Sequence, residues 1–326
     1  MTGPRCLVTG ATGAVGPAVV RRIAREGASI VALARHAPPA GLLPDNVEIA
    51  THDLADAAVA PLAREADVIV HLAATLHVNN PGADLRTAYE RTNVDATRRL
   101  VDAARPSARF VFFGTIDVYG PTPAGTTATE DTPPHTRSLY GETKLRAEPF
   151  VLAHPGGTVL RLAAVYGPRV KANYARLARA IARGRYVGVG PGTNRRTVVF
   201  EEDVADAAWR VANARALPSR IYNLTDGHPH TVDDIVAAIA AALGKRPPRL
   251  RLPAPLVKSA AWMGDGAARL VGRRFPVTPA MVDKLQEHIA VSGERLMREL
   301  RFEPAWDLTR GWQAAIAAMT IGEKMP

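Results

Sequence analysis

Short, nearly all-apolar runs alternate with amphipathic stretches through the first half of this 326-residue chain. The apolar runs are typical of buried β-strands, and the stretches between them have the apolar spacing of helices. Strands are expected at residues 5–9, 29–33, 67–72, 109–113 and 158–162, and helices at 14–26, 83–104 and 141–153. This alternation implies an α/β fold with a doubly wound parallel sheet, covered by helices on both faces and binding ligands at the carboxyl ends of the strands.

The alternation becomes less regular after residue 168. A strand end leading into a helix is expected at 198–212, and a strand at 221–224. Thr231 is expected to cap a helix at 231–243 that Gly244 ends, before a proline-rich connector at 246–255. The predicted domains are 1–168 with 198–224 returning to it, and a smaller mixed α/β C-terminal substrate domain made of 169–197 and 225–326.

Composition excludes several classes of protein. Hydrophobic residues make up 47% of the chain and charged residues 22%, which is enough to bury a large core. The single cysteine, Cys6, excludes a disulfide framework and a zinc site built on several thiolates, and no metal site is expected. The N-terminus lacks a signal-peptide pattern, and no apolar run reaches about 18 residues. We expect a soluble, cytoplasmic protein with no membrane partner.

The net charge of +10 comes from basic residues scattered along the chain rather than gathered in a tail. Nucleic-acid binding would need clusters of Lys and Arg interleaved with aromatic residues, and aromatic residues are only 6% of the chain. No nucleic-acid partner is expected. Since a compositional bias toward arginine explains the global charge, only local arginines can argue for an anionic ligand.

A glycine-rich turn follows the first expected strand and opens the first expected helix. It reads Gly10-Ala11-Thr12-Gly13-Ala14-Val15-Gly16. Glycines permit a tight turn and a close approach of ligand to backbone, and the start of a helix favours a pyrophosphate. This context predicts a Rossmann-type dinucleotide-binding domain. Cofactor contacts are assigned to Gly10, Thr12, Gly13, Ala14, Val15 and Gly16.

The end of the second strand bears on the choice between NAD and NADP. A carboxylate there would hydrogen-bond the ribose 2′-hydroxyl, whereas an arginine would pair with a 2′-phosphate. The sequence has no carboxylate at this point and has Arg35. NADP(H) is therefore favoured over NAD(H), with a solvent-exposed arginine in an arginine-rich protein as the alternative reading.

The spacing Gly-x-x-Gly-x-x-Gly resembles that of the short-chain dehydrogenase/reductase family. In that family an Asp-Leu pair after the third strand lies at the adenine amino group, and the resemblance gives this role to Asp53 and Leu54. The fourth strand of the family ends where the chain passes the cofactor. On this basis cofactor contacts are assigned to Leu72, Ala73 and Ala74, and a substrate contact to Thr75.

Tyr140 and Lys144 are four residues apart and therefore on one face of a helix. A tyrosine with its usual pKa of about 10 is a poor base at neutral pH, and a nearby cation favours its phenolate. We expect Lys144 to keep the pKa of Tyr140 low and to hold the nicotinamide ribose. Tyr140 would then exchange a proton with the substrate.

Thr115 lies 25 residues before Tyr140 and is followed by Val118-Tyr119-Gly120. Together with Tyr140, Lys144 and the glycine turn, this pattern resembles the extended short-chain dehydrogenases, which include sugar-nucleotide epimerases, dehydratases and ketoreductases. The resemblance covers nearly the whole chain. It implies that the Thr115 hydroxyl hydrogen-bonds the reacting substrate oxygen. Asn93 matches a position that helps to order the active site, and capping of a helix is the alternative role for its side chain.

Two later segments narrow the substrate through the same resemblance. Asn173 corresponds to an asparagine that contacts the diphosphate in sugar-nucleotide enzymes, and Arg196 to an arginine that pairs with a nucleotide phosphate. UDP-galactose 4-epimerases have a second phosphate-binding arginine late in the chain, and Arg273 and Arg274 are the candidates for it here. No Asp-Glu pair directly follows Thr115, which disfavours 4,6-dehydration.

The resemblance therefore implies NAD(P)-dependent transfer of hydride at C4 of a nucleotide-linked hexose, the nucleotide-diphosphate sugar being the small-molecule partner. A 4-ketoreductase is favoured over a UDP-sugar 4-epimerase because of Arg35. The alternatives are a 3β-hydroxysteroid dehydrogenase-like enzyme and a non-catalytic NADP-sensing protein. In a steroid enzyme Trp262, Met263, Leu270 and Val271 would line an apolar pocket or a membrane-facing patch, but core packing is favoured for them. A homodimer is expected through a four-helix contact of 83–104 and 141–153 from each subunit.

Overall fold

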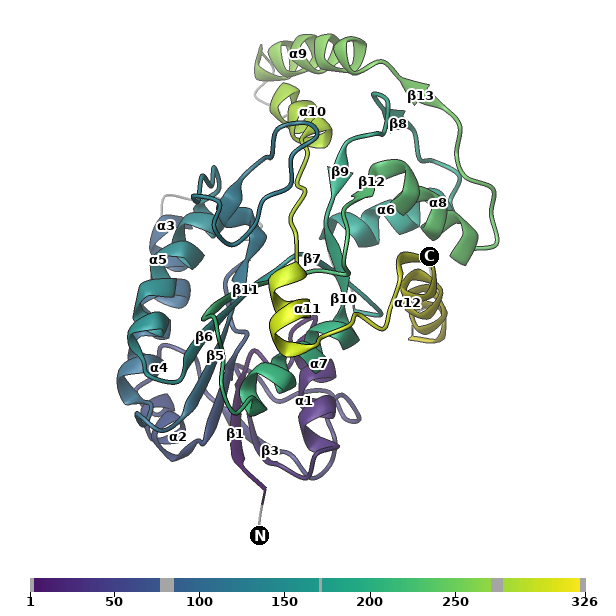
Figure 1. The fold of residues 1–326 in the computed structure, drawn as a ribbon. Helices are drawn as coiled ribbons and strands as arrows, with labels where there is room; N and C mark the ends of the chain where they lie inside the picture. Colours follow the sequence, from purple (N-terminus) through teal and green to yellow (C-terminus); the bar gives the residue numbers. More distant parts are fainter. Residues whose placement is uncertain (1–2, 77–84, 170–171, 271–277, 323–326) are drawn as a thin grey trace.

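The computed structural model describes residues 3–76, 85–169, 172–270 and 278–322. Seven strands form one parallel sheet in the order β11-β6-β5-β4-β1-β2-β3 (Figure 1). Their bounds are β1 Arg5–Thr9, β2 Ser29–Ala34, β3 Glu48–Thr51, β4 Val68–His71, β5 Arg109–Thr115, β6 Gly157–Leu162 and β11 Ile221–Leu224. The predicted doubly wound α/β fold is confirmed, and the strand expected at 221–224 does join the sheet.

Helices cover both faces of this sheet (Figure 1). On one face α1 (Gly16–Ala24) packs against α7 (Glu201–Asn213), and on the other α4 (Ala96–Ala103) lies between α2 (Val59–Glu65) and α5 (Leu139–Ala153). Two separate clusters of buried apolar side chains fill the spaces between the sheet and these two layers. The parallel strands are buried on both faces, which is why their sequences are almost continuously apolar.

Two predicted helices differ from the observed ones. Helix α1 begins at Gly16 rather than at residue 14, because the glycine turn continues to Val15. The long helix expected at 83–104 is observed as α3 (Leu85–Tyr89), a π-helical turn at Glu90–Asp95 and then α4. Residues 83 and 84 lie outside the described part of the chain. The wider turn contains Asn93. Turns of this π-helical kind are often found at functional sites.

The remaining elements form a smaller layer beside the carboxyl ends of the strands. They are β7 Ala164–Tyr166, α6 Ala172–Ala182, β8 Gly188–Val189, β9 Arg195–Arg196, β10 Val198–Phe200, β12 His230–Thr231, α8 Val232–Ala242, β13 Arg251–Leu252, α9 Ala254–Leu270, α10 Pro279–Gln286, α11 Glu294–Leu300 and α12 Leu308–Gly322. The short strands pair as β10 with β7, β12 with β9 and β13 with β8. The expected connector at 246–255 therefore contains β13 and the start of α9. The proposed domain boundaries remain a prediction.

The start of helix α8 confirms a capping prediction. The Thr231 hydroxyl accepts from the backbone N–H of Asp234 at 3.1 Å, and the Asp234 carboxylate accepts from the backbone N–H of Thr231 at 2.9 Å. Gly244, with φ of +67°, follows the other end of the helix, where the left-handed conformation favours glycine. Among the described residues, no helix has the length and apolarity needed to cross a bilayer.

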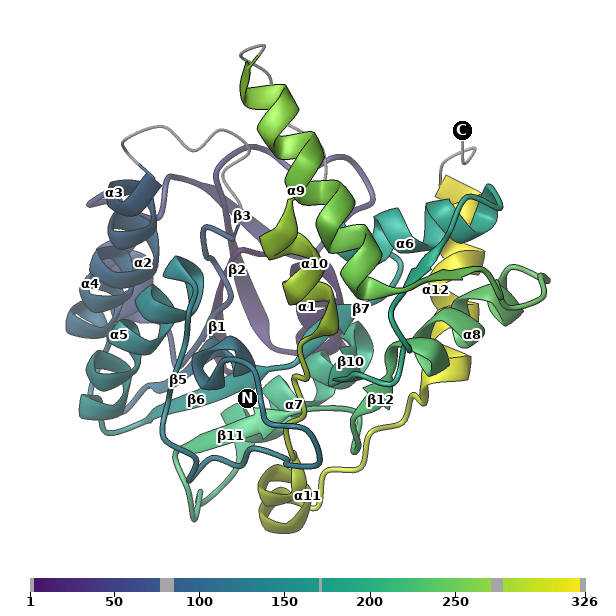
Figure 2. The same ribbon diagram turned by 90° about the horizontal axis from the view of Figure 1, so that it is seen from above.

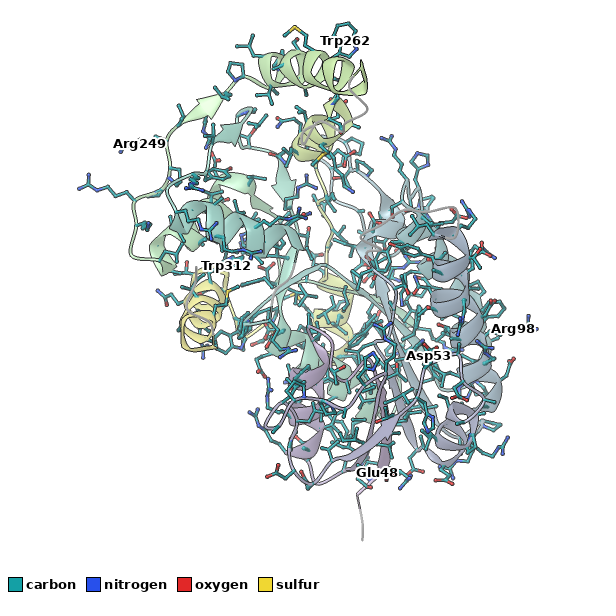
Figure 3. The ribbon with its side chains drawn as sticks, turned by 180° about the vertical axis from the view of Figure 1, so that it is seen from behind. Glu48, Asp53, Arg98, Arg249, Trp262 and Trp312 are labelled. Carbon is teal, nitrogen blue, oxygen red and sulfur yellow. The ribbon has the colours of Figure 1, made fainter. Side chains whose placement is uncertain are left out.

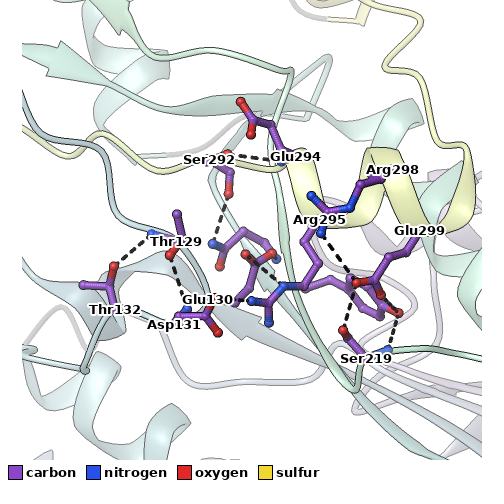
Figure 4. Close-up of polar contacts among 12 residues, drawn as sticks. Thr129, Glu130, Asp131, Thr132, Ser219, Ser292, Glu294, Arg295, Arg298 and Glu299 are labelled. Atoms are coloured by element: carbon purple, nitrogen blue, oxygen red, sulfur yellow. Dashed lines mark hydrogen bonds and ion pairs between the residues drawn. The ribbon is translucent and has the colours of Figure 1, made fainter.

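A polar network fastens α11 to the outer strand of the sheet (Figure 4). The Arg295 guanidinium donates to Asp131 at 2.6 Å and lies 3.6 Å from Glu130, which accepts from the backbone N–H of Asn223 in β11 at 2.8 Å. The Glu299 carboxylate accepts from the Tyr222 hydroxyl at 2.9 Å. These contacts place the C-terminal segment across the edge of the sheet, next to the strands that hold the candidate site.

Candidate functional site

The glycine turn has the geometry of an anion-binding loop. Gly10 has φ of +71°, a backbone conformation that favours glycine. A Cβ there would also lie 2.7 Å from the backbone nitrogen of Ala73, which leaves no room for a side chain. A Cβ on Gly16 would lie 2.4 Å from the carbonyl oxygen of Ala11. Helix α1 has no side-chain cap and no acidic residue in its first turn. Pro17, the second residue of the helix, has no N–H, and the Ala18 N–H already bonds to the Val15 carbonyl at 3.1 Å. The N–H groups of Ala14, Val15 and Gly16 make no hydrogen bond within the described residues and are therefore available to a phosphate.

Arg169 and Glu201 lie against this turn, and the sequence interpretation missed both. The Arg169 Nη2 points to the Thr12 carbonyl at 3.5 Å, and its buried Nε has no hydrogen-bond partner. Its backbone N–H bonds to the Glu201 carboxylate, whose pKa rises to about 7, mainly through burial and also through the charge of Glu202. The only sequence signal was Glu201 itself, a carboxylate directly after the apolar run 198–200.

Asn93 joins three parts of the site. Its side chain is fully buried, and its Oδ1 accepts from the Thr75 N–H at 2.8 Å. Its Nδ2 donates to the Thr75 carbonyl at 3.2 Å and to the Thr143 hydroxyl at 3.1 Å. Asn93 therefore fixes the backbone after β4 against helix α5, and its side chain does not cap a helix. This placement agrees with the ordering role that the resemblance implied.

Thr115 and the start of α5 are connected through Asp117. Thr115 ends β5, and its hydroxyl accepts from the Asp117 N–H at 3.2 Å. Ser138 caps α5 by accepting from the Gly141 N–H at 2.9 Å, and its hydroxyl donates to the Asp117 carboxylate. Tyr140 follows in the first turn of α5, close enough to Asp117 to feel its charge. The structure thus brings the predicted threonine and tyrosine to the same end of the sheet.

The expectation that Lys144 keeps the pKa of Tyr140 low is wrong. Burial, and then the nearby Asp117 and Tyr89, raise the pKa of Tyr140 above its usual value. Lys144 itself is only 1% exposed, and burial lowers its pKa to about 7. Its Nζ lies 3.8 Å from the centre of the Phe112 ring and has no hydrogen-bond partner. The spacing placed the two residues correctly, but it carried no information on burial.

A buried ion pair anchors the helix that carries Tyr140 and Lys144. The Arg161 guanidinium makes two bonds to the Glu148 carboxylate of α5, at 2.9 and 2.6 Å, and a third to the Tyr119 hydroxyl at 2.8 Å. Arg161 and Glu148 are 3% and 2% exposed. A Cβ on Gly114 would lie 3.3 Å from both side chains, which explains a glycine next to the candidate catalytic threonine.

The predicted adenosine contacts lie at the ends of β2 and β3. Arg35 is exposed directly after β2 and makes no hydrogen bond or ion pair within the described residues. Asp53 is exposed after β3, where its Oδ1 accepts from the Ala55 N–H at 2.8 Å and lies 3.8 Å from Arg91. Leu54 is buried. Figure 3 shows Asp53 beside the sheet. Both charged groups are accessible to a ligand.

The predicted substrate residues are farther from the sheet. Asn173 is exposed on α6 and accepts from Arg176 at 3.0 Å. Arg196 is half-buried in β9, where its guanidinium donates to the Lys284 carbonyl of α10 at 2.7 Å. Arg273, Arg274 and Val271 lie outside the described residues, as does the side chain of Leu270.

Core packing was the wrong prediction for the two described residues of the C-terminal apolar group. Trp262 is 73% exposed and Met263 is 64% exposed, both on α9. Among residues 254–264 of this helix, Ala261 is the one buried side chain. An apolar sequence alone did not show which face of α9 is covered.

Comparison with known proteins gives the family. Residues 6–225 match the model of the NAD dependent epimerase/dehydratase family. This chain belongs to that family. Among its relatives, a UDP-glucose 4-epimerase of Vibrio cholerae is 29% identical over 96% of this chain and 94% of its own. A probable dTDP-4,6-dihydroxy-2-methyloxan-3-one 4-ketoreductase of Streptomyces antibioticus is 29% identical over 86% of this chain and 96% of its own.

The fold of this epimerase/dehydratase family member also matches solved structures. MoeE5 in complex with UDP-glucose and NAD has a TM-score of 0.75 and 26% identity, with 97% of this chain and 99% of that chain covered. The predicted extended short-chain dehydrogenase architecture and enzyme class are thereby confirmed. The preference for NADP is not settled by these similarities, since MoeE5 is described with NAD.

The residues present fit the nicotinamide dinucleotide that the family implies. In the turn the N–H groups of residues 14–16 are free to bind a pyrophosphate, and Arg169 adds an Nε that has no partner among the described residues. The buried Nζ of Lys144 is a donor without an acceptor, which is costly unless a ligand supplies one. Lys144 is therefore suited to hold a ribose hydroxyl, and Arg169 a phosphate oxygen.

Replacing Asp117 with asparagine is expected to lower the pKa of Tyr140. The Asp117 charge is one cause of the raised pKa of Tyr140, so removing it lowers that pKa. The asparagine side chain would keep an oxygen for Ser138. The measurement is the titration of Tyr140 in wild type and variant, followed by NMR of the protein labelled with 13C at the tyrosine ring carbon that bears the hydroxyl. A pKa of Tyr140 that is unchanged or higher in Asp117→Asn would contradict this account.

Proposed function

We propose that the protein is an NAD(P)-dependent oxidoreductase acting at C4 of a nucleotide-linked hexose. This proposal is carried by Thr115 at the carboxyl end of β5 together with Tyr140 and Lys144 in the first two turns of α5, the helix that packs against β5. The sequence similarity to a UDP-glucose 4-epimerase and to a 4-ketoreductase, and the structural similarity to MoeE5 with UDP-glucose, support the substrate class.

Each group of the trio has a distinct task in this proposal. When bound, the nicotinamide accepts or donates a hydride. Tyr140 exchanges a proton with the C4 oxygen, and Thr115 donates a hydrogen bond to that oxygen. Lys144 becomes a paired, charged group once a ribose hydroxyl approaches its Nζ. The raised pKa of Tyr140 keeps its hydroxyl protonated, which suits a group that donates a proton to a C4 ketone.

Substrate recognition is assigned to residues on both sides of the trio. The backbone of Thr75, a few residues after β4, is held by Asn93, and the Thr75 hydroxyl is proposed to contact the sugar. Arg196 is proposed to pair with a nucleotide phosphate. Burial disfavours the charged form of Arg196 and lowers its pKa, and a bound phosphate would offset this effect. Asn173 is proposed to contact the diphosphate. A homodimer through α4 and α5 remains a prediction.

Both a 4-ketoreductase and a 4-epimerase use these residues, and they differ in what happens to the cofactor. A reductase releases it after one hydride transfer, whereas an epimerase retains it and returns the hydride to the other face of the sugar. The test is mass spectrometry of nucleotides released from purified, denatured protein. We expect little bound nucleotide and, after addition of NADPH, reduction of a nucleotide-linked 4-ketohexose. Stoichiometric NAD⁺ with conversion of UDP-glucose to UDP-galactose would favour the epimerase instead.

The proposed NADP preference predicts a selective effect of Arg35→Ser. The guanidinium would pair with the 2′-phosphate, and a charge-assisted bond to phosphate contributes about 1.5–3 kcal/mol. The Kd for NADPH should rise about tenfold or more while that for NADH stays within about twofold. Fluorescence titration of both nucleotides measures this. Arg25→Ser, which changes an exposed arginine at the far end of α1, is the control. Equal loss for both nucleotides would contradict the proposal.

Of the two other functions, the steroid enzyme has one feature in its favour, the exposed Trp262 and Met263 that would form its membrane-facing patch. A 3β-hydroxysteroid substrate would not need Arg196 or Asn173, and a cofactor-sensing protein would not need Thr115. Failure of all nucleotide-linked sugars to be turned over, with NADPH still bound, would favour one of these alternatives.

A further inference from the structure

In the described part of helix α9, Ala261 is buried while large apolar side chains are exposed. Ala261 is only 2% exposed, and one turn earlier Val257 is half-buried. On the other sides of the helix Leu256 is 65% exposed, Trp262 73% and Met263 64%. A helix that only covers a globular core has the opposite arrangement, with its large apolar side chains inside. Figure 3 shows Trp262 at the outer edge of the molecule.

The apolar surface continues onto the neighbouring elements. Ten large apolar side chains are exposed in the described part of the chain, and six of them lie on β13, α9 and α10. We call these six the α9 surface: Leu252, Leu256, Trp262, Met263, Met281 and Leu285. A shallow hollow lies between α9 and the start of α10, bordered by Trp262, Met263 and Pro279. Scattered single exposed residues need no explanation, but a concentration on one part of a protein marks an interaction surface.

The charges around the α9 surface are predominantly positive. Two of the described carboxylates nearby are paired with cations, Asp283 with Lys258 at 2.7 Å and Asp233 with Arg251. In contrast, the exposed side chains of Arg246, Arg249 and Lys284 make no ion pair or hydrogen bond within the described residues. Figure 3 shows Arg249 extending away from the protein. The elements of the α9 surface thus carry one unpaired cation, Lys284 on α10, and the connector that leads into β13 adds Arg246 and Arg249.

This combination points to one kind of partner. We propose that the α9 surface docks on the surface of an anionic lipid bilayer. Tryptophan is favoured at the interface between lipid and water, and lysine and arginine beside it are attracted to anionic headgroups. A symmetric contact between two copies would instead bring the same unpaired cations of both subunits together, which is unfavourable. The proposal replaces the expectation from the sequence that no membrane is a partner.

Docking would place the candidate site close to the bilayer. The α9 and α10 helices lie at the end of the molecule toward which the sheet strands run (Figures 1 and 2). Arg196, the proposed phosphate contact, is hydrogen-bonded to the backbone of Lys284 in α10. The inference does not depend on the proposed reaction, because it rests on the α9 surface alone.

Tryptophan fluorescence offers a direct test. Of the four tryptophans, Trp262 alone is highly exposed, while Trp209 and Trp312 are 7% and 1% exposed and Trp306 is half-buried. Vesicles of phosphatidylcholine with about 30% phosphatidylglycerol should shift the emission to shorter wavelength at low salt, since part of the attraction is electrostatic. Phosphatidylcholine brominated on its acyl chains should quench the same emission. Vesicles of phosphatidylcholine alone should have a much weaker effect.

Variants locate the contact. The double substitution Trp262→Ser with Met263→Ser should reduce co-flotation with anionic vesicles by about tenfold or more, since it removes two apolar side chains from the lipid boundary. Arg249→Glu with Lys284→Glu should do the same without changing the melting temperature. Ile49→Ser, at an exposed apolar position on β3, is the matched control and should leave flotation unchanged.

Three results would overturn the proposal. The first is no flotation of the wild-type chain with anionic vesicles at low salt. The second is flotation that the Trp262→Ser, Met263→Ser variant retains. The third is a dimer in light-scattering measurements that this variant converts to a monomer, because the α9 surface would then be a contact between copies. The melting temperature and far-UV circular dichroism of all the variants serve as the check that they are folded, so a failure of the proposed reaction leaves the vesicle result interpretable.

Discussion

Tyr140→Phe should reduce turnover of a nucleotide-linked 4-ketohexose by about 10²–10⁴-fold, the range for loss of a positioned proton donor or acceptor. The reason is chemical: phenylalanine has the same shape but no hydroxyl to exchange a proton with the C4 oxygen. Tyr140 lies in the first turn of α5, where Ser138 caps the helix and Asp117 holds the cap, and none of these bonds uses the tyrosine hydroxyl. The helix should therefore keep its position.

Two measurements separate a chemical role of Tyr140 from a structural one. The Kd for NADPH should stay within about threefold of the wild-type value, and the melting temperature should not fall. Tyr186→Phe, which removes the hydroxyl of a half-buried tyrosine outside the site, should leave turnover unchanged. A Tyr140→Phe variant that keeps more than about one tenth of the wild-type rate would show that another group transfers the proton.

The sheet and its anion-binding turn could be predicted because their signals are local. An apolar strand, glycines in the turn and a following helix lie within about twenty residues, and each part has one physical reason. The start of α8 is of the same kind, since Thr231 and Asp234 cap it without help from distant residues. The position of Arg35 after β2 follows equally from the short-range pattern.

The electrostatics of the site could not be predicted in this way. Burial lowers the pKa of Lys144 to about 7, and its Nζ lies over the ring of Phe112, from a strand some thirty residues earlier in the sequence. Arg169 contacts the Thr12 carbonyl although the two residues are 157 positions apart in the sequence. Burial and pairing between distant segments determine a pKa, and a single sequence does not report either. The exposure of Trp262 and Met263 on α9 could not be predicted for a related reason. Periodicity shows that a helix has apolar residues, but it does not show whether another part of the protein covers them.

The substitution Lys144→Met is expected to have two large effects of opposite sign. It should raise the free energy of unfolding, and it should inactivate the protein. The Lys144 side chain is 1% exposed, its Nζ has no hydrogen-bond partner, and burial lowers its pKa from 10.5 to about 7. In the unfolded chain the pKa returns to its usual value. Between about pH 7 and pH 10.5 the unfolded chain therefore binds a proton that the folded protein does not, and the free energy of unfolding rises with pH across this window.

Below about pH 7 both states are protonated, and the folded protein then bears the full cost of a buried charge. The contact of Nζ with the Phe112 ring offsets part of that cost. Methionine fills a similar volume without a charge, so the variant should gain about 1–4 kcal/mol at pH 6 and much less at pH 10. In a chain of this size, each kcal/mol raises the melting temperature by roughly 2 °C. Melting curves at both pH values measure the difference, and Lys284→Met, at an exposed lysine, should change neither.

The same substitution should weaken nucleotide binding, because the Lys144 Nζ is the donor proposed for the ribose. We expect the Kd for NADPH to rise about tenfold or more, and turnover to fall at least as far as binding. Stability and function then move in opposite directions, which is typical of a group kept for its ligand rather than for the fold. A Lys144→Met variant that melts at a lower temperature at pH 6, or that binds NADPH as the wild type does, would show that Lys144 instead stabilises the helix that carries Tyr140.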